Sequence, residues 1–269
     1  MHLETERLVL RPVTLADSAE IAETIFSDPN VVGMLAHNTK TADDALLEAE
    51  RWTSIMGIDG SGGIWENGGM GLFAVLPKTA EDRLAGVAGF YMEKNERDLW
   101  TGEYFYALGS DWHGRGLMSE AADLFGKKLR EMKDLGVIYA GYWDLINEAS
   151  GRLLMRTGLR PKGRKPVTEE YSPERCLRMF DYDLWRLQEA DSPRQKDDIL
   201  LQAARRAGAF VAEDVLDKDI AIRFLEDSYG STLTKDALTM LEKAIAQPGM
   251  SYLEIRGPRE SGTPVNRLR

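Results

Sequence analysis

Residues 109–129, GSDWHGRGLMSEAADLFGKKL, place Gly114 and Gly116 on either side of Arg115, where an expected strand ends and an expected helix begins. The first N–H groups of a helix have no partner within the helix, and the helix dipole adds partial positive charge there. Glycine lets the backbone approach a ligand closely, and Arg115 adds a fixed positive charge. The stretch therefore predicts a phosphate or pyrophosphate site, although a tight turn alone would also explain the two glycines.

The charge of the chain excludes some classes of function. Its 269 residues include 44 Asp and Glu against 34 Lys and Arg, which gives a formal net charge of −10. A general nucleic-acid binder needs a basic face, so we expect no nucleic-acid partner. The acidity suits a cationic partner such as an amine or a basic peptide, although solubility alone would also account for it.

Three further features concern the setting of the protein. The sequence contains no run of about 18 apolar residues, so we expect no membrane span. Its first residues, MHLETERLVLRP, lack the basic start and apolar run of a signal peptide. Cys176 is the single cysteine, which rules out an intrachain disulfide. These features predict a cytoplasmic protein, and we assign no metal ligands.

Composition changes near residue 190, where WRLQEADSPRQKDD forms a polar joint. We therefore predict one domain over residues 1–189 and a helical appendage over residues 190–269. The appendage holds 12 Lys and Arg and 13 Asp and Glu, so almost all of the net charge belongs to residues 1–189. At about 80 residues the appendage is near the lower limit for independent stability, and we expect it to dock on the first domain or in a homodimer.

Residues 1–189 combine strand and helix patterns. Alternating or β-branched runs predict strands at RLVLRPV, GLFAVLP, RLAGVAGFYME, WTGEYFYALGS and VIYAGYW, and RCLRMFDYDLWRL is a candidate for the strand that closes the sheet. Helices are predicted from the N-cap Thr14 to a stop before Pro29, and over residues 41–56, 115–134 and 147–158. Short turns between the middle strands favour antiparallel pairing. We therefore predict an α+β fold with a mainly antiparallel sheet flanked by helices.

The appendage shows helical periodicity and no motif that indicates chemistry. Apolar residues recur three and four apart in KDDILLQAARRAGAF and LTKDALTMLEKAIAQPG, and DKDIAIRFLEDSYG is expected to form a third helix. MSYLEIRG is a candidate short strand. We interpret the appendage as an interaction or dimerisation module.

The order and spacing of these motifs resemble the GNAT family of acyl-CoA-dependent N-acetyltransferases. The resemblance covers roughly residues 3–187, and is carried by LETERLVLRPVTLADSAEIAETIFSDPNV, GEYFYALGSDWHGRGLMSEA, NEASGRLLMRTGL and MFDYDLWRL. It is closest to the branch that contains ribosomal-protein alanine N-acetyltransferases and spermidine acetyltransferases. A GNAT-type fold with acetyl-CoA as co-substrate is what the resemblance implies.

The resemblance also assigns residues to the coenzyme. In the family, backbone amides of the loop between strand and helix bind the coenzyme A pyrophosphate, and an asparagine at a later helix start contacts the pantetheine arm. The corresponding residues here are Leu108, His113, Gly114, Arg115, Gly116, Leu117, Met118, Ser119, Asn147 and Ser150. Two positions depart from the family pattern, because His113 stands for Gln or Arg and Met118 for a small residue. Asn147 is also well suited to cap a helix.

Glu103 is the candidate catalytic base. It aligns with a glutamate that this branch often carries, on the strand that leads into the coenzyme loop. Alternation puts it on one face with Phe105 and Ala107, where partial burial would raise its pKa. A structural carboxylate in a surface ion pair is the alternative. The position of the family's tyrosine general acid is Leu154, so we assign no acid, although Tyr104, Tyr106 and Tyr142 are possible substitutes.

The acceptor side is expected to include His37, Trp65 and Glu66. The resemblance implies an amine acceptor, either a protein N-terminus or a small cationic amine. A non-catalytic acyl-CoA-binding sensor is the alternative from another class of function.

Overall fold

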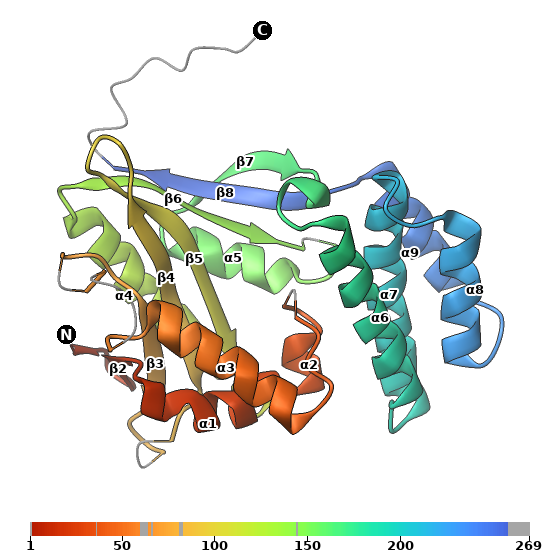
Figure 1. The fold of residues 1–269 in the computed structure, drawn as a ribbon, viewed down its shortest axis with the longest axis horizontal. Helices are drawn as coiled ribbons and strands as arrows, with labels where there is room; N and C mark the ends of the chain where they lie inside the picture. The colour runs from red at the N-terminus through yellow and green to blue at the C-terminus, as the bar shows by residue number, and fades with distance from the viewer. Residues whose placement is uncertain are drawn as a thin grey trace, which may run out of the picture.

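The computed structural model describes residues 2–35, 37–59, 64–65, 67–80, 83–143 and 145–257 (Figure 1). Its centre is an eight-stranded sheet with the order β1-β2-β3-β4-β5-β6-β8-β7. The strands are β1 Leu3–Glu4, β2 Leu8–Pro12, β3 Leu72–Pro77, β4 Gly86–Lys94, β5 Trp100–Leu108, β6 Leu135–Tyr142, β7 Arg160–Lys165 and β8 Met250–Arg256. Neighbouring strands are antiparallel except β5 and β6, which are parallel. The predicted α+β class is confirmed.

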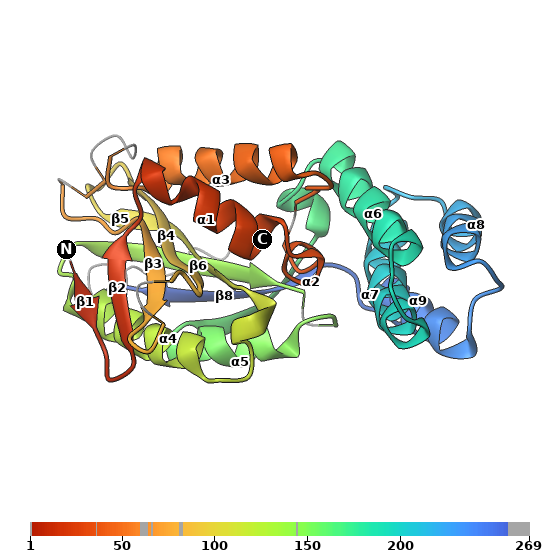
Figure 2. The same ribbon diagram turned by 90° about the horizontal axis from the view of Figure 1, so that it is seen from below.

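Helices cover both faces of the sheet, as Figure 2 shows. One face carries α1 Ser18–Ile21, which continues as the π-helical turn η2 Ala22–Phe26, then α2 Pro29–Val32 and α3 Ala42–Met56. The other face carries α4 Leu117–Glu131 and α5 Glu148–Arg156. Each side has its own apolar core, because alternate residues of the central strands point to opposite faces.

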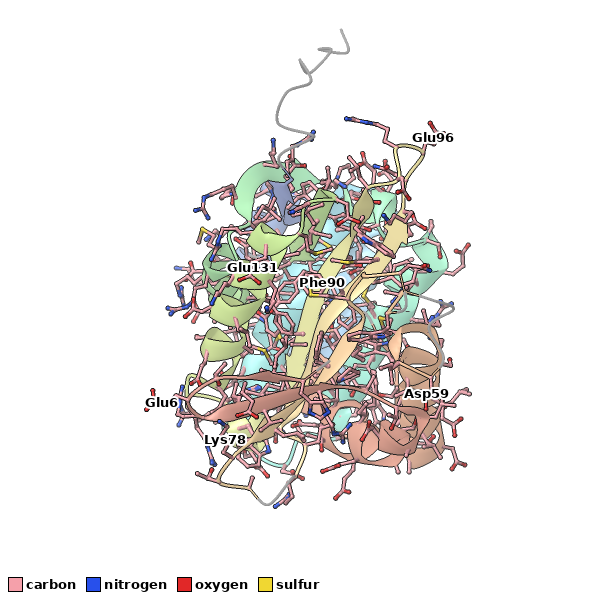
Figure 3. All side chains as sticks on the ribbon, turned by 90° about the vertical axis from the view of Figure 1, so that its left-hand side faces the viewer. Glu6, Asp59, Lys78, Phe90, Glu96 and Glu131 are labelled. Carbon is pink, nitrogen blue, oxygen red and sulfur yellow. The ribbon has the colours of Figure 1, made fainter. Side chains whose placement is uncertain are left out.

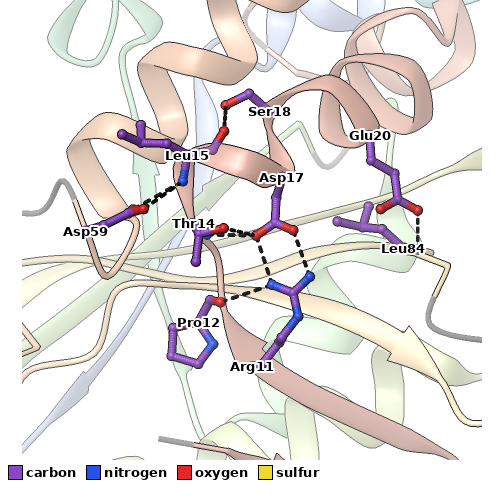
Figure 4. Close-up of polar contacts among 9 residues, drawn as sticks. All are labelled: Arg11, Pro12, Thr14, Leu15, Asp17, Ser18, Glu20, Asp59 and Leu84. Atoms are coloured by element: carbon purple, nitrogen blue, oxygen red, sulfur yellow. Dashed lines mark hydrogen bonds and ion pairs between the residues drawn. The ribbon is translucent and has the colours of Figure 1, made fainter.

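The start of the first helical segment is held to β2 by a buried carboxylate (Figure 4). Arg11 forms a two-pronged pair with Asp17, through Nη1 to Oδ2 at 2.8 Å and Nη2 to Oδ1 at 2.7 Å. The backbone N–H of Thr14 donates to the same carboxylate at 2.7 Å. Burial would raise the pKa of Asp17, but Arg11 and Thr14 outweigh it and lower the pKa. Thr14 is the N-cap of the first helical turn, Leu15–Asp17.

Aromatic side chains fill the core on the α4 side. Phe90 lies between the sheet and α4 (Figure 3), with its ring centroid 5.1 Å from Tyr104 and 5.5 Å from Phe125. Tyr104 is 1% exposed and Phe125 is fully buried. This side of strand β5 is therefore a packed core, and Glu103 points to the opposite face.

The strand that closes the sheet comes from the last part of the described chain. β8 pairs with β6 over six residues and with β7 over five, so it lies between them. The segment expected to close the sheet instead forms helix α6, Pro173–Gln188, and that prediction is wrong. Its buried positions include Cys176, Met179, Phe180 and Leu187, which recur with helical spacing. The candidate strand MSYLEIRG is confirmed as β8.

Four helices intervene between β7 and β8. They are α6, α7 Pro193–Ala212, α8 Lys218–Tyr229 and α9 Lys235–Ala246, and they form the cluster at one end of the molecule in Figures 1 and 2. The predicted boundary near residue 190 falls in the turn between α6 and α7. The helices share an apolar core with Trp143 and Met250 of the sheet domain. None of the helices in the described ranges is long and apolar enough to cross a membrane.

Candidate functional site

The loop between β5 and α4 has a backbone that glycine alone adopts easily. Gly114 and Gly116 have φ of +73° and +72°, in the left-handed region, and Gly116 is the N-cap of α4. Residues 113–116 are exposed. Within the described residues, no backbone acceptor is found for the N–H groups of residues 114–119. Two glycines with positive φ and a helix start without a side-chain cap therefore present a row of free donors. This arrangement binds phosphate groups.

Arg7 binds the backbone carbonyls of this loop. Its Nη1 donates to the carbonyl of Arg115 at 2.8 Å, and its Nη2 to the carbonyl of Gly116 at 3.3 Å. Its Nε and its backbone N–H both donate to the carboxylate of Glu120, at 2.6 and 2.8 Å. The carbonyls of the loop are thereby held on the Arg7 side, which leaves the amides facing the other way.

The two departures from the family pattern have clear structural consequences. The Nε2–H of His113 donates to the carbonyl of Leu108 at 2.8 Å, because a carbonyl can only accept, so His113 fastens the loop to the end of β5. Met118 is 5% exposed and packs in the α4-side core with Leu117, so its side chain points away from the loop amides. Arg115 donates to the carbonyl of Asp111 at 2.8 Å and lies over the ring of Trp112 at 4.9 Å.

Strands β5 and β6 are paired along only part of their length. Their paired positions are Trp100 with Leu135, Gly102 with Ile138, and Glu103 with Tyr139, and none follows in the described strands. Beyond that point β6 continues to pair with β8, while residues 104–108 of β5 pair only with β4. The edge of β5 towards β6 therefore keeps backbone donors and acceptors free for an extended ligand.

Side chains from β5 and α5 meet beside this edge. The hydroxyl of Tyr106 donates to Ser150 Oγ at 2.7 Å, and burial raises the pKa of Tyr106 to about 12. Asn147 is the N-cap of α5, and its Oδ1 accepts from the backbone N–H of Ser150 at 3.1 Å. Asn147 thus has the capping role that its residue type favours.

Glu103 lies at the point where β5 and β6 separate, on the opposite face of β5, towards α3. Burial first, and then the nearby Glu170 carboxylate, raise the pKa of Glu103 from 4.5 to about 7, while Arg175 acts in the opposite direction. Glu170 and Arg175 belong to the turn after β7 and the start of α6. No hydrogen-bond or ion-pair partner is found for the Glu103 carboxylate within the described residues, so the surface ion pair considered as the alternative is not formed among them.

An aromatic group continues this face of the sheet. The ring of Trp52 contacts Phe105 at 5.0 Å, Phe26 at 4.9 Å and His37 at 5.5 Å, between centroids. His37 Nδ1 lies 3.0 Å from Glu48 Oε1. Burial lowers the pKa of His37, although the Glu48 hydrogen bond opposes this, so the imidazole is neutral at pH 7 and donates Nδ1–H to Glu48. His37 thus belongs to the aromatic group that contacts Phe105 through Trp52, and Phe105 is two positions along β5 from Glu103.

The remaining predicted residues lie elsewhere. Trp65 contacts Phe73 at 5.0 Å and donates its Nε1–H to the carbonyl of Met56, so it packs with the α4-side core, opposite to Glu103. Glu66 lies outside the described residues. Leu154 is 2% exposed and packs in the core. Of the possible substitutes for a tyrosine acid, Tyr104 is buried in the core, and the ring of Tyr142 lies against Gly151.

Some residues of the site could not be found from local sequence. Arg7 reaches residues more than 100 positions away, and Glu170 and Arg175 approach Glu103 only because the chain returns from β7 into α6. Each of them lies in a polar stretch of ordinary composition. No local signal distinguishes such residues from other surface charges.

Comparisons with known proteins agree with this architecture. The model of the family "Acetyltransferase (GNAT) domain" matches residues 7–160, which is more than half of the chain. No curated protein matches the sequence.

Three solved structures illustrate the likeness. A GNAT-family acetyltransferase from Bacillus anthracis is 24% identical, with a TM-score of 0.45 over 61% of this chain and 86% of that chain. Ribosomal-protein-S5-alanine acetyltransferase from Vibrio fischeri is 20% identical, with a TM-score of 0.46 over 62% of this chain and 86% of that chain. Spermidine N-acetyltransferase from Vibrio cholerae, in complex with CoA and spermine, is 16% identical. Its TM-score is 0.44 over 60% of this chain and 85% of that chain. On the family match, the chain belongs to the GNAT family of acetyltransferases, as its motifs predicted.

Proposed function

We propose that this protein transfers the acetyl group of acetyl-CoA to a primary amine, with Glu103 as the proton acceptor. The observation that carries the proposal is the state of Glu103, which is partly buried, has no ion-pair partner among the described residues and has its pKa raised to about 7. A general base is most effective when its pKa lies near the working pH. Its place where β5 and β6 separate supports the same role.

The residues of the loop fit a coenzyme with a pyrophosphate group. The free N–H groups of residues 114–119 and the guanidinium of Arg115 would hold the pyrophosphate. The unpaired edge of β5 and the start of α5 at Asn147 and Ser150 would hold the extended arm. Acetyl-CoA supplies an acetyl group that is activated as a thioester.

The acidic side chains near Glu103 suit a cationic acceptor. An aliphatic amine is mostly protonated at pH 7, and it must lose a proton before it can attack a carbonyl carbon. Glu103 and Glu170 together attract the ammonium form, and Glu103 then takes its proton, directly or through a water molecule. The acceptor is either the N-terminus of a protein or a small cationic amine, and both present such a group.

The test is an acetylation assay on the full chain that follows release of free thiol. Spermine and a peptide with a free N-terminal alanine represent the two acceptor classes. We expect Glu103→Gln to lower kcat by about 10²–10⁴-fold while coenzyme A affinity is unchanged. Glu96→Gln, in the exposed turn between β4 and β5, is the matched control and should behave as wild type.

Two results would contradict the proposal. Equal kcat in wild type and Glu103→Gln would remove Glu103 from the mechanism. A wild-type chain that binds acetyl-CoA and acetylates neither acceptor class would favour the non-catalytic sensor.

A further inference from the structure

A polar cavity that contains no residue of the coenzyme loop lies between α2, α6 and α7. Its volume is about 290 Å³ and it opens to solvent. Helix α2 lies next to α6 in both Figure 1 and Figure 2. The charged residues of its lining are Arg186, Arg194 and Asp198, and Asn30, Ser192 and Gln202 add polar groups. The lining thus contains two positive side chains and one negative side chain.

Arg186 forms the inner wall of this cavity and is 3% exposed. Its Nη1 donates to Gln202 Oε1 at 3.2 Å and to Asp183 Oδ1 at a long 3.5 Å. Its Nε is buried and has no acceptor among the described residues. The guanidinium packs flat on Gly33, where an added Cβ would lie 2.1 Å from Nη1. Arg186 is therefore held rigidly, and its hydrogen-bonding capacity is only partly used.

The charge around Arg186 is unbalanced. Asp183 is fully buried, and its closer partner is Arg206, whose Nη1 donates to Asp183 Oδ2 at 2.7 Å. Arg206 is 1% exposed and also donates to the carbonyl of Gly33. Two buried guanidinium groups therefore share one buried carboxylate, and with Arg194 and Asp198 of the lining the group still carries a net charge of about +1. An uncompensated buried charge is costly, and a bound anion would offset that cost.

The rim of the cavity adds further attraction for an anion. Arg194 is exposed and lies in the first turn of α7, a helix of 20 residues whose N-terminus carries partial positive charge. Ser192 caps this helix by accepting from the backbone N–H of Gln195. The start of α7 and Arg194 thus lie at the rim of the cavity, and Arg186 forms its wall.

We propose that this cavity binds a small oxyanion, a carboxylate or a phosphate monoester, between Arg186 and Arg194. Planar guanidinium groups match both kinds of oxyanion. A bound anion would also connect α6 and α7 to α2, because Arg186 and Arg206 both contact Gly33 at the end of that helix.

The test is calorimetric titration of the full chain at constant ionic strength. Inorganic phosphate and methyl phosphate probe the phosphate arm, acetate and citrate probe the carboxylate arm, and chloride is the reference. We expect saturable binding in one arm, with affinity reduced about tenfold in Arg194→Ala and abolished in Arg186→Gln. Arg223→Ala, an exposed arginine on α8, should bind as wild type does. Arg194→Ala decides the result if Arg186→Gln fails to fold.

The coenzyme loop also attracts phosphate, so a further variant separates the two sites. Arg115→Ala should leave binding in the cavity intact. The proposal is overturned if no anion binds saturably below about 10 mM, if Arg194→Ala binds as tightly as wild type, or if Arg115→Ala removes all of the binding.

Discussion

Glu103 of β5 and Tyr139 of β6 are the last paired positions between these two parallel strands. The proposed base therefore lies at the point where the sheet opens, and not within its hydrogen-bonded part. Burial first, and then Glu103, raise the pKa of Tyr139 to about 12, so the two groups interact electrostatically. A carboxyl at this point can be desolvated by the sheet and still meet a ligand that enters between the strands.

The first prediction concerns the pH dependence of catalysis. Glu103 must be ionised to accept a proton, and its pKa is about 7. We expect kcat/KM to rise with pH through about 7 and then to level off or follow the amine. In Glu103→Gln, kcat/KM should no longer rise near pH 7. It should change with pH only through the deprotonation of the acceptor amine. A wild-type profile that is flat from pH 6 to 8 would contradict the assignment.

The second prediction concerns the pH dependence of stability. The folded pKa of Glu103 is raised from 4.5 to about 7, so the folded state binds more protons than the unfolded state between these values. The Glu103 contribution to the free energy of unfolding therefore falls as pH rises from about 4.5 to about 7. We expect Glu103→Gln to be more stable than wild type at pH 8 by up to roughly 3 kcal/mol, at about 1.4 kcal/mol per pKa unit.

Chemical denaturation at pH 5 and pH 8 measures this difference. Near pH 5 it should be small, because most of Glu103 is protonated in the folded state. Glu96→Gln serves again as the control and should give the same small effect at both values. A Glu103→Gln advantage that does not grow with pH would mean that the carboxyl is not held in its neutral form.

The third prediction tests the backbone of the coenzyme loop. Gly116→Ala forces a side chain into the left-handed region, which costs roughly 1–2 kcal/mol, and it should turn the free amides at the start of α4. Gly230→Ala is a matched control, because Gly230 has φ of +85° at the end of α8 and open space around its Cα. Both variants should lose similar stability, and only Gly116→Ala should weaken acetyl-CoA binding in a calorimetric titration.

The fourth prediction concerns Arg7, which holds the loop through the carbonyls of Arg115 and Gly116. Arg7→Met should weaken acetyl-CoA binding several-fold, with a loss of stability below about 1 kcal/mol because the side chain is half exposed. Arg156→Met removes a comparable exposed pair with Asp123 elsewhere on α4 and should leave binding unchanged. Equal affinities in the two variants would show that the loop does not need Arg7.

The sequence predicts the coenzyme loop because the required features are local. Gly114 and Gly116 have the positive φ that only glycine adopts easily, and they directly precede an amphipathic helix. The strands β3, β4 and β5 are predicted for the same reason, since short turns join them. Glu103 is a candidate because the family resemblance aligns it with a glutamate that the branch often carries. Alternation along β5 then fixes its face, where burial raises its pKa to about 7.

The far edge of the sheet could not be predicted from local patterns. Strand β7 is almost wholly exposed and its sequence, RPKGRK, shows no alternation of apolar and polar residues. Strand β8 returns to the sheet only after four helices, so its partners are set by tertiary contacts. Residues 175–187 are a strand candidate in the sequence, and this is wrong because their buried positions follow a helical period.

The last prediction tests the position of β8. A chain that ends after Gly249 lacks the strand that separates β6 from β7, and it loses the buried side chains of Met250 and Leu253. Among the described strands, β7 has no other partner in the sheet. We expect this chain to melt well below wild type or to unfold without cooperativity, as measured by circular dichroism. A chain that ends after Gly257 keeps every described strand and should melt as wild type does. If both truncated chains melted as wild type does, β8 would contribute little to the closure of the sheet. The helices α6–α9 would then form an appendage that is independent of the sheet.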